Sequence, residues 1–402
     1  MEAYLLDWAN LLLRWLHVIT AIAWIGSSFY FVFLDSSLLA PTAEDLKAKG
    51  VDGAIWSVHG GGFYHAQKYM VAPKGGIDSH LHWFYWESYW TWMSGFALFV
   101  VLYLWNAGIF LVDKQVFDWS PLAAGIGALV FLAAFWFIYD AICRIFGQRA
   151  NGDRIVGALV LAVVVCSSWI AFQLFSGRAA FLMVGASLAT AMSANVFFWI
   201  IPGQRKVVAA MTSGQPYNPA DYAIYGKRGK QRSVHNTYFT LPVLVAMLSN
   251  HYSFIYSHPQ RWAILLVLML AGALIRLFFV QRHGYKLGRV GNPWPYAAAG
   301  VVLLLALIAW LKPAPAVPAA ALPAKVSYAQ IQPILAQRCY VCHGEAVQQK
   351  NLRVDSEALV SANAQLIYQQ VVASKLMPLA NSTQMTEDER ALVGRWFQGQ
   401  GK

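Results

Sequence analysis

The sequence predicts an all-α protein, in which a polytopic membrane bundle of eight transmembrane helices precedes a small domain outside the membrane. Three observations lead to this fold class. Of the 402 residues, 58% are hydrophobic and only 12% are charged, whereas a soluble globular chain carries roughly 25% charged residues. Eight apolar stretches are each long enough to cross a bilayer, which takes about 20 residues. A proline-rich segment then separates them from a far less apolar end of the chain.

The eight stretches cover residues 11–34, 83–105, 120–142, 155–175, 180–201, 236–256, 262–281 and 294–311. We expect the first to be a permanent helix and not a cleaved signal peptide. It is too long for a signal peptide, it has no small-residue cleavage site, and it follows Glu2 and Asp7 instead of a basic segment.

Basic residues are distributed unevenly between the loops. The loops 35–82, 143–154, 202–235 and 282–293 contain sixteen Lys and Arg, whereas the alternate loops contain only Lys114, Arg178 and Arg261. Cytoplasmic loops carry the excess of basic residues, so both termini are expected on the outer side. The net charge of +11 is then an orientation signal, and the expected partner is the lipid bilayer and no nucleic acid.

Composition also predicts the domain boundaries. Residues 1–311 form the membrane domain, and residues 312–324 (KPAPAVPAAALPA) form a Pro/Ala-rich linker. Proline at this density favours an extended, semi-rigid spacer. Residues 325–402 are expected to form a small soluble domain.

Residues 339–343 read Cys-Tyr-Val-Cys-His, which is the attachment signature of a c-type haem. The thiols of Cys339 and Cys342 would bond to the haem vinyl groups, and His343 would place an imidazole on the iron. A zinc site would need two more Cys or His ligands, and none follows in 344–402. A thioredoxin-like motif would need a βαβ pattern, which the sequence lacks. We therefore predict one covalent haem c in a cytochrome c domain over residues 325–402.

The second axial ligand of this haem is expected to be a methionine, because His343 is the only histidine of the domain. Met377 precedes Pro378 in a loop-like setting. Met385 precedes Thr386 and Glu389, which form a capping-box pattern at a helix start, so Met385 is interpreted as the hydrophobic residue before the cap. We predict Met377 as the ligand. A Met/His pair raises the iron potential, so the haem should accept electrons readily.

Nine of the ten histidines lie in the first 283 residues, and ionisable groups at membrane depth are functional candidates. His17 and His251 fall near the outer face. They are candidate ligands of a b-type haem or another metal in the membrane domain. The alternative is that each one hydrogen-bonds a helix carbonyl.

A second group of candidates falls at the inner face, namely His80, His82, Glu87 and His235. On a helix, Glu87 shares a stripe with Thr91 and Ser94. His80 extends this stripe, and His82 points away from it. The alternative role for the two histidines is that of interface anchors.

The chain resembles the bacterial membrane-bound urate oxidases (urate hydroxylases), which join an eight-span N-terminal domain to a C-terminal cytochrome c. The residues that carry the resemblance are Arg14-Trp15-Leu16-His17-Val18, His59-Gly60-Gly61-Gly62-Phe63-Tyr64-His65, Trp86-Glu87-Ser88-Tyr89-Trp90-Thr91-Trp92, His235-Asn236-Thr237-Tyr238-Phe239-Thr240-Leu241-Pro242, Ser249-Asn250-His251-Tyr252, the Cys-x-x-Cys-His motif and Met377-Pro378. The resemblance covers essentially the whole chain.

The resemblance implies an oxidoreductase that converts urate to 5-hydroxyisourate and passes electrons through its c-type haem to an acceptor of the respiratory chain. It also implies a bacterial inner membrane location, with the N-terminus and the cytochrome c domain on the periplasmic side. Because the resemblance supplies no catalytic residues, our hypothesis draws on the inner-face group. His80, His82, Glu87 and His235 would supply the base, and Trp83 and Trp86 the aromatic walls.

Two other functions remain open from the sequence. The first is a membrane-anchored cytochrome c subunit that transfers electrons for a separate dehydrogenase or for quinol. The second is a transporter with a redox-sensing tail, which is disfavoured because no pair of spans shows the broken-helix symmetry of transporters.

Overall fold

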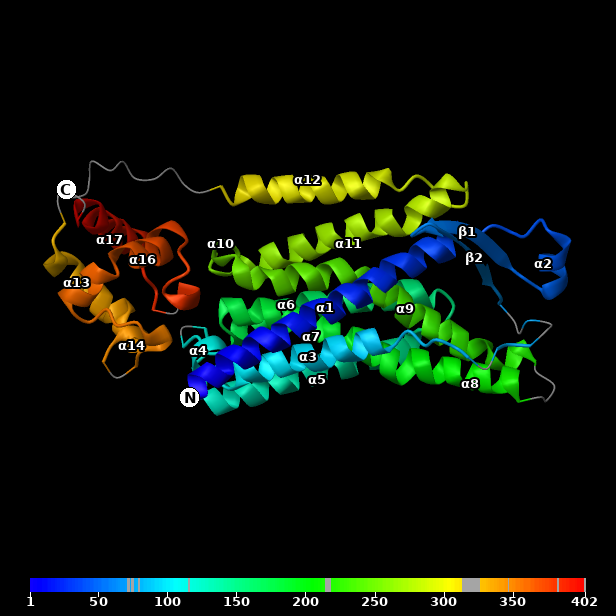
Figure 1. Ribbon diagram of the computed structural model, residues 1–402, viewed down its shortest axis with the longest axis horizontal. Helices are drawn as coiled ribbons and strands as arrows, with labels where there is room; N and C mark the ends of the chain where they lie inside the picture. Colours follow the sequence, from blue (N-terminus) through cyan, green and yellow to red (C-terminus); the bar gives the residue numbers. More distant parts are fainter. Residues whose placement is uncertain are drawn as a thin grey trace.

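The computed structural model describes residues 1–70, 73, 76–78, 80–114, 116–213, 218–312, 326–345, 347–381 and 383–400. Long helices run side by side in an elongated bundle, and a smaller helical domain lies at the end of the bundle where the chain begins (Figure 1).

The helices of the bundle follow the predicted apolar stretches. Its long helices are α1 (Glu2–Ser37), α3 (Trp86–Phe99), α5 (Pro121–Phe146), α6 (Gly152–Leu174), α7 (Gly177–Asn195), α8 (Ile201–Thr212), α9 (Pro219–Leu248), α11 (Arg261–Lys286) and α12 (Trp294–Trp310). The π-helical turn η1 (Val100–Leu104) extends α3, and a second π-helical turn, η2 (Val196–Ile200), joins α7 to α8. Shorter pieces are α4 (Ala107–Phe110), η3 (Ser249–His251) and α10 (Ser253–Tyr256). Each of the eight predicted stretches overlaps one of these helices.

Several of these helices have the length and composition of membrane spans. In the described part of the chain, five helical segments are long and apolar enough to cross a membrane, namely Tyr4–Ser37, Pro121–Phe146, Gly152–Leu174, Gly177–Thr212 and Arg261–Lys286. The helix α12 is apolar but has only 17 residues, and α3 has 14 before η1 begins. The fold therefore agrees with a multi-pass membrane protein, and the count of eight spans stays a prediction.

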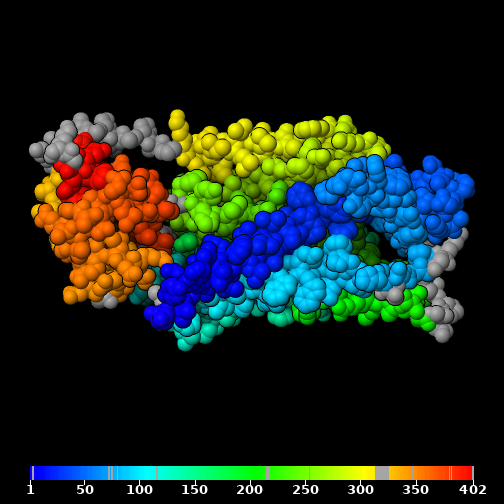
Figure 2. All heavy atoms as spheres, in the orientation of Figure 1, coloured from blue at the N-terminus to red at the C-terminus, as the bar shows by residue number. Residues whose placement is uncertain are grey.

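Among the five helical segments that could cross a membrane, the one that begins with α7 is the most deeply buried and α1 is the most exposed. A Cβ atom at Gly185 of α7 would lie 2.9 Å from the Cβ of Ala246, so the glycine allows α7 and α9 to approach closely. By contrast, α1 packs only along one side, against α3 and α11, and lies across the surface of the bundle in Figure 2.

The all-α prediction is wrong for one segment of the inner loop 35–82. After the short helix α2 (Glu44–Lys49), the strands β1 (Gly53–His59) and β2 (Gly62–Lys68) form an antiparallel hairpin. Gly60 and Gly61 form its turn with φ angles of +59° and +81°, which are strained for other residues. Two glycines between runs rich in aromatic and β-branched residues predict such a hairpin, so the sequence did contain this signal.

The C-terminal domain is a separate set of short helices around its own core. It comprises α13 (Tyr328–Arg338), α14 (Tyr340–His343), η5 (Gln349–Asn351), α15 (Glu357–Ala362), α16 (Ala364–Ile367), η6 (Tyr368–Ala373), η7 (Leu379–Asn381) and α17 (Glu387–Gln400). The predicted capping box is confirmed: the Glu389 N–H donates to Thr386 Oγ1 (3.2 Å) and the Thr386 N–H donates to Glu389 Oε2 (2.6 Å). Met385, before the cap, is buried in the core as predicted.

The predicted linker, residues 312–324, lies outside the described residues apart from Lys312. Among the described residues, an ion pair joins the C-terminal domain to the bundle. Lys350 Nζ of η5 lies 2.6 Å from Asp7 Oδ1 of α1. Both side chains are exposed, so this pair contributes little to stability.

Candidate functional site

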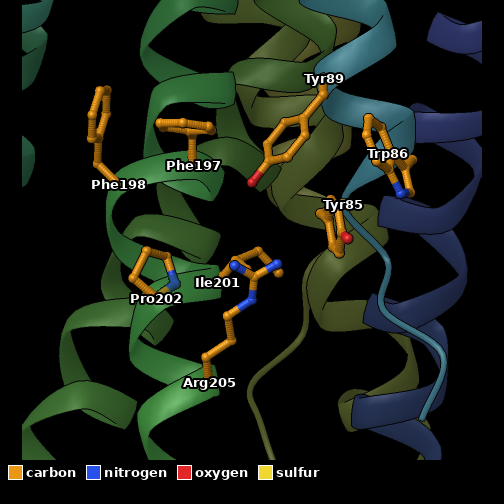
Figure 3. A pocket seen from close by; sticks show the side chains of 8 residues that line it. All are labelled: Tyr85, Trp86, Tyr89, Phe197, Phe198, Ile201, Pro202 and Arg205. Carbon is orange, nitrogen blue, oxygen red and sulfur yellow. The ribbon is translucent and has the colours of Figure 1, made fainter. Parts of the chain in front are cut away.

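A pocket of about 470 Å³ opens between the first turn of α3, the π-helical turn η2 and the start of α8. Its walls are mostly aromatic, and Figure 3 shows the side chains that line it: Tyr85, Trp86, Tyr89, Phe197, Phe198, Ile201, Pro202 and Arg205. By the predicted topology, this end of α3 is the cytoplasmic end. A concave site with apolar walls and few polar groups is the usual form of a small-molecule site.

Arg205 is the charged residue among the side chains that line this pocket. Its guanidinium carbon lies 5.8 Å from the ring centre of Tyr85 and 6.0 Å from that of Trp83. In Figure 3 the guanidinium extends toward Tyr85. A planar cation among aromatic faces favours a flat, anionic ligand, because rings stack on such a ligand and the arginine supplies paired N–H donors.

The π-helical turn η2 connects this pocket to a buried polar cluster. Phe197 and Phe198 line the pocket, while Trp199 donates its indole N–H to Asp140 Oδ1 of α5 at 2.8 Å. Consecutive aromatic residues of this wider turn thus reach both the pocket and the buried polar cluster, which agrees with the frequent occurrence of π-bulges at functional sites.

The centre of the polar cluster is an ion pair between Arg232 of α9 and Asp140 of α5. Arg232 Nη2 lies 2.7 Å from Asp140 Oδ1, and the two residues are only 2% and 6% exposed. Arg144 contacts the other oxygen, Asp140 Oδ2, from the surface at 2.7 Å. A buried charge of this kind has to be paired, because an unpaired one is costly away from water.

The cluster extends from Arg232 to His235 by hydrogen bonds. Arg232 Nη1 donates to Asn195 Oδ1 (3.1 Å), since a guanidinium only donates. The amide nitrogen of Asn195 then faces Tyr139 and donates to its hydroxyl oxygen (2.9 Å). The Tyr139 hydroxyl is also hydrogen-bonded to His235 Nδ1 at 2.8 Å, and the tautomer of the imidazole sets which of the two groups donates.

The other predicted inner-face residues lie apart from His235. His80 and His82 are exposed on the segment before α3, where the His80 backbone N–H contacts Asp78 and the His82 ring packs edge-on against Phe84. Glu87 lies in the first turn of α3. The described contacts of His235 are with Tyr139, Cys143 and Phe239. The predicted fourfold group is therefore not assembled around one point.

His17 packs against α3, on the stripe predicted for Thr91 and Ser94. Its Nδ1 lies 3.1 Å from the Thr91 carbonyl oxygen and 3.2 Å from Ser94 Oγ. A Cβ atom at Gly95 would lie only 2.8 Å from the imidazole Cε1, so the glycine makes room for the ring. This is the bond to a helix carbonyl that the sequence left open, and because it uses Nδ1 it is also compatible with metal binding through Nε2.

His251 is exposed in η3, and its neighbour Asn250 accepts a hydrogen bond from the Tyr103 hydroxyl at 2.9 Å. His17 contacts Ser94, which lies nine residues before Tyr103, or about 13 Å along a helix. The assignment of His17 and His251 as a ligand pair stays a prediction.

In the C-terminal domain, the haem-attachment motif occupies the end of α13 and the short helix α14. Nδ1 of His343 lies 3.3 Å from the Leu352 carbonyl oxygen. A bond of this kind fixes the ring and leaves Nε2 for a metal. Burial together with Cys342 raises the pKa of the Cys339 thiol to about 12, and burial also raises the pKa of Cys342. A dithiol redox centre usually lowers the pKa of one cysteine, whereas burial here shifts both in the opposite direction.

The two methionines of this domain differ in burial. Met385 is 3% exposed and belongs to the core, whereas Met377 is only partly buried and packs against the same core as Cys339 and Leu352. The Trp396 indole N–H is buried with no partner among the described residues, as expected beside a polar group of a bound cofactor. The residues present therefore fit a c-type haem. In the described part of the chain, no cluster of three His, Cys, Asp or Glu side chains forms another metal site.

Sequence reasoning missed Arg205 and the Asp140–Arg232 pair. Both arginines were counted only as orientation charges of the loop 202–235. Asp140 carried a usable signal, because an acidic residue within an apolar stretch is a functional candidate by default. Nothing in the sequence indicated which arginine would meet it.

Comparison with protein-family models matches residues 3–312 to the family described as urate oxidase N-terminal. No curated protein and no solved structure matches the chain. The matched range includes all the helices of the bundle and ends before the C-terminal domain.

Proposed function

This chain belongs to the urate oxidase N-terminal family, and from that premise we propose that it is a membrane-bound urate oxidase linked to a cytochrome c. In this proposal the bundle oxidises urate to 5-hydroxyisourate, and a haem c on the C-terminal domain passes the electrons to the respiratory chain. The single observation that carries the proposal is the aromatic pocket with Arg205 at its wall.

The pocket matches the chemistry of urate in shape and charge. Urate is a flat anion, and the rings of Tyr85, Trp86 and Phe197 offer faces or edges for a flat ligand. Arg205 supplies the opposite charge, and its N–H donors match the carbonyl oxygens attached to the rings of urate. The low polarity of the remaining wall strengthens this attraction, because it is screened less than in water.

The reaction needs a place for protons as well as electrons. Urate and one water give 5-hydroxyisourate, two protons and two electrons. Among the predicted candidates we propose His235 as a proton acceptor. His235 bonds to Tyr139, and the ring centre of Tyr139 lies 5.9 Å from that of Trp136. Trp136 in turn stacks on Phe198 of the pocket, with 6.0 Å between the ring centres. Protons would therefore reach His235 through an intervening donor such as water. His80 and His82, on the segment before α3, and Glu87, in the first turn of α3, remain proposed contributors.

The C-terminal residues are proposed to hold the electron acceptor. Cys339 and Cys342 would carry the haem through thioether bonds, and His343 and Met377 would supply the protein ligands of its iron. A bound haem c supplies one-electron transfer, and the oxidation of one urate releases two electrons. The Leu352 carbonyl orients His343, and Met385 belongs to the domain core.

The proposed location is the bacterial inner membrane. The pocket lies at the end of the bundle that bears the basic loops, and the C-terminal domain lies at the opposite end (Figure 1). Urate would thus bind from the cytoplasm, and electrons would leave on the periplasmic side. A b-type haem or another metal in the membrane domain, between the pocket and the C-terminal domain, remains part of the proposal, with His17 and His251 as the candidate ligands that the sequence names.

The direct test uses the purified full-length protein in detergent, without oxygen. Added urate is expected to reduce the c-type haem of the protein, seen as the sharpened visible bands of ferrous haem, with 5-hydroxyisourate detected as the product. If a quinol reduces the haem and urate leaves it ferric, the chain is instead an electron-transfer subunit.

The role of Arg205 has its own test. Arg205→Met is expected to weaken urate binding roughly 10- to 150-fold, because a hydrogen bond to a charged group contributes about 1.5–3 kcal/mol. The effect should appear in KM more than in kcat. Lys206→Met is the matched control, since it removes the same charge from the next residue, whose ammonium lies over Tyr225. Equal effects of the two substitutions would mean that general charge, and not the pocket, attracts urate.

A further inference from the structure

Arg390 of α17 is an almost completely buried cation in the C-terminal domain. The residue is 4% exposed. The nearest acidic contact is long, with 3.9 Å between Arg390 Nε and Glu387 Oε1, and the Glu387 side chain is 72% exposed. Because a buried charge is costly unless it is bonded, the main partners of this guanidinium must be the neutral acceptors around it.

Those acceptors all belong to the segment that carries Met377. Arg390 Nη1 donates to the carbonyl oxygen of Met377 at 2.7 Å and to that of Val371, and Nη2 donates to Asn381 Oδ1 at 3.2 Å. The Arg390 side chain therefore holds the segment at three positions: before Met377, at Met377 and after Met377. An arginine has five N–H donors in a fixed planar fork, so one side chain can make these three bonds to separate acceptors.

The same segment is closed at its far end by Asn381. Its side chain accepts from the Met385 N–H (3.0 Å) and donates to the Met385 carbonyl (3.2 Å). The Met377 N–H donates to the Gln370 carbonyl at 2.9 Å. The backbone N–H and carbonyl of Met377 are thus both hydrogen-bonded, while its thioether side chain is only partly buried.

We propose that Arg390 is a positioning residue for the axial methionine of the haem, acting through the Met377 carbonyl and the Asn381 side chain. This inference rests on the proposed c-type haem. A thioether is a weak ligand, so its occupancy depends on how closely the backbone holds it in place before it binds. Without Arg390 the Met377 segment would be held by fewer bonds, and the methionine would leave the iron more often.

The test compares Arg390→Gln with Lys375→Gln in the full-length haem-containing protein. Both remove one positive charge near Met377, but Lys375 is exposed and pairs with Glu387. The readouts are the weak near-infrared band of methionine-ligated ferric haem and the affinity for added imidazole. Arg390→Gln is expected to lose most of the band and to bind imidazole at least ~10-fold more tightly, because imidazole binds only the fraction whose methionine is displaced. Lys375→Gln should match the wild type.

Two further variants keep the inference testable if Arg390→Gln folds poorly. Arg390→Lys retains the charge with fewer directed donors and should give an intermediate imidazole affinity. Asn381→Ala removes the bond between Arg390 Nη2 and Asn381 Oδ1, and it should weaken the near-infrared band and increase the imidazole affinity, as Arg390→Gln does. If these variants unfold at lower temperature but keep the wild-type band and imidazole affinity, Arg390 is merely structural and the inference is overturned. A wild-type chain without covalent haem would overturn the proposed function as well.

Discussion

A Cys339→Ser/Cys342→Ser double variant is expected to lose all covalently attached haem and, with it, all reduction of haem by urate. The physical reason is that the two thioether bonds are the only covalent links the proposal contains. His343 alone would leave a haem that is removed by denaturation. The measurement is the mass of the denatured chain, together with haem staining after denaturing electrophoresis.

The chain contains a matched control for this experiment. Cys166 is an exposed cysteine of α6, and Cys166→Ser should keep the full haem content and the full urate-dependent reduction. A double variant that still carries haem through denaturation would show that the attachment is elsewhere. A wild-type chain of apoprotein mass would remove the cytochrome c from the proposal altogether.

An Arg232→Met variant is expected to lose about 3–5 kcal/mol of stability, the usual result of removing one partner from a buried ion pair. The substitution leaves Asp140 with the Trp199 indole and the surface Arg144 as partners and breaks the bond that orients Asn195. Asn195 then no longer holds the Tyr139 hydroxyl toward His235, so urate turnover should fall as well. Equilibrium unfolding in detergent measures the first effect.

Arg144→Met is the control for this variant, because both arginines contact the same carboxylate. The Arg144 side chain is 62% exposed and that of Arg232 only 3%, so the loss from Arg144→Met should be about 0–1 kcal/mol. Similar losses from both substitutions would contradict the view that burial makes the Arg232 pair important. An Asp140→Asn variant should resemble Arg232→Met, since it leaves the guanidinium unpaired.

Comparison of the two domains shows which parts of a site sequence can predict. The haem motif could be predicted because its residues are adjacent in the chain, and Met377 was distinguished from Met385 by a local helix-start pattern, which the structure confirms; the haem itself stays a prediction. The aromatic pocket was predicted only in part. Trp86 lines it as expected, but Phe197 and Arg205 come from a helix more than a hundred residues further along.

The hairpin shows an error of sequence reasoning, because it was missed although Gly60 and Gly61 give a local signal for it. For His17 and His251, distance from the ends of the predicted spans gave only an approximate depth. The contacts of His17 with Thr91 and Ser94, and of Asn250 beside His251 with Tyr103, come from the tertiary structure.

The sequence by itself determined which segments form the apolar helices, how the basic loops are distributed and where a haem would be attached. These properties are local, because transfer of a segment into lipid depends on its own side chains and on its own backbone hydrogen bonds. The tertiary structure alone decided that Arg232 meets Asp140, that Asn195 links them to Tyr139 and His235, and that Arg205 faces the rings of α3. Those contacts depend on how each helix is rotated and shifted against its neighbours, which is set by close packing of side chains distant in sequence.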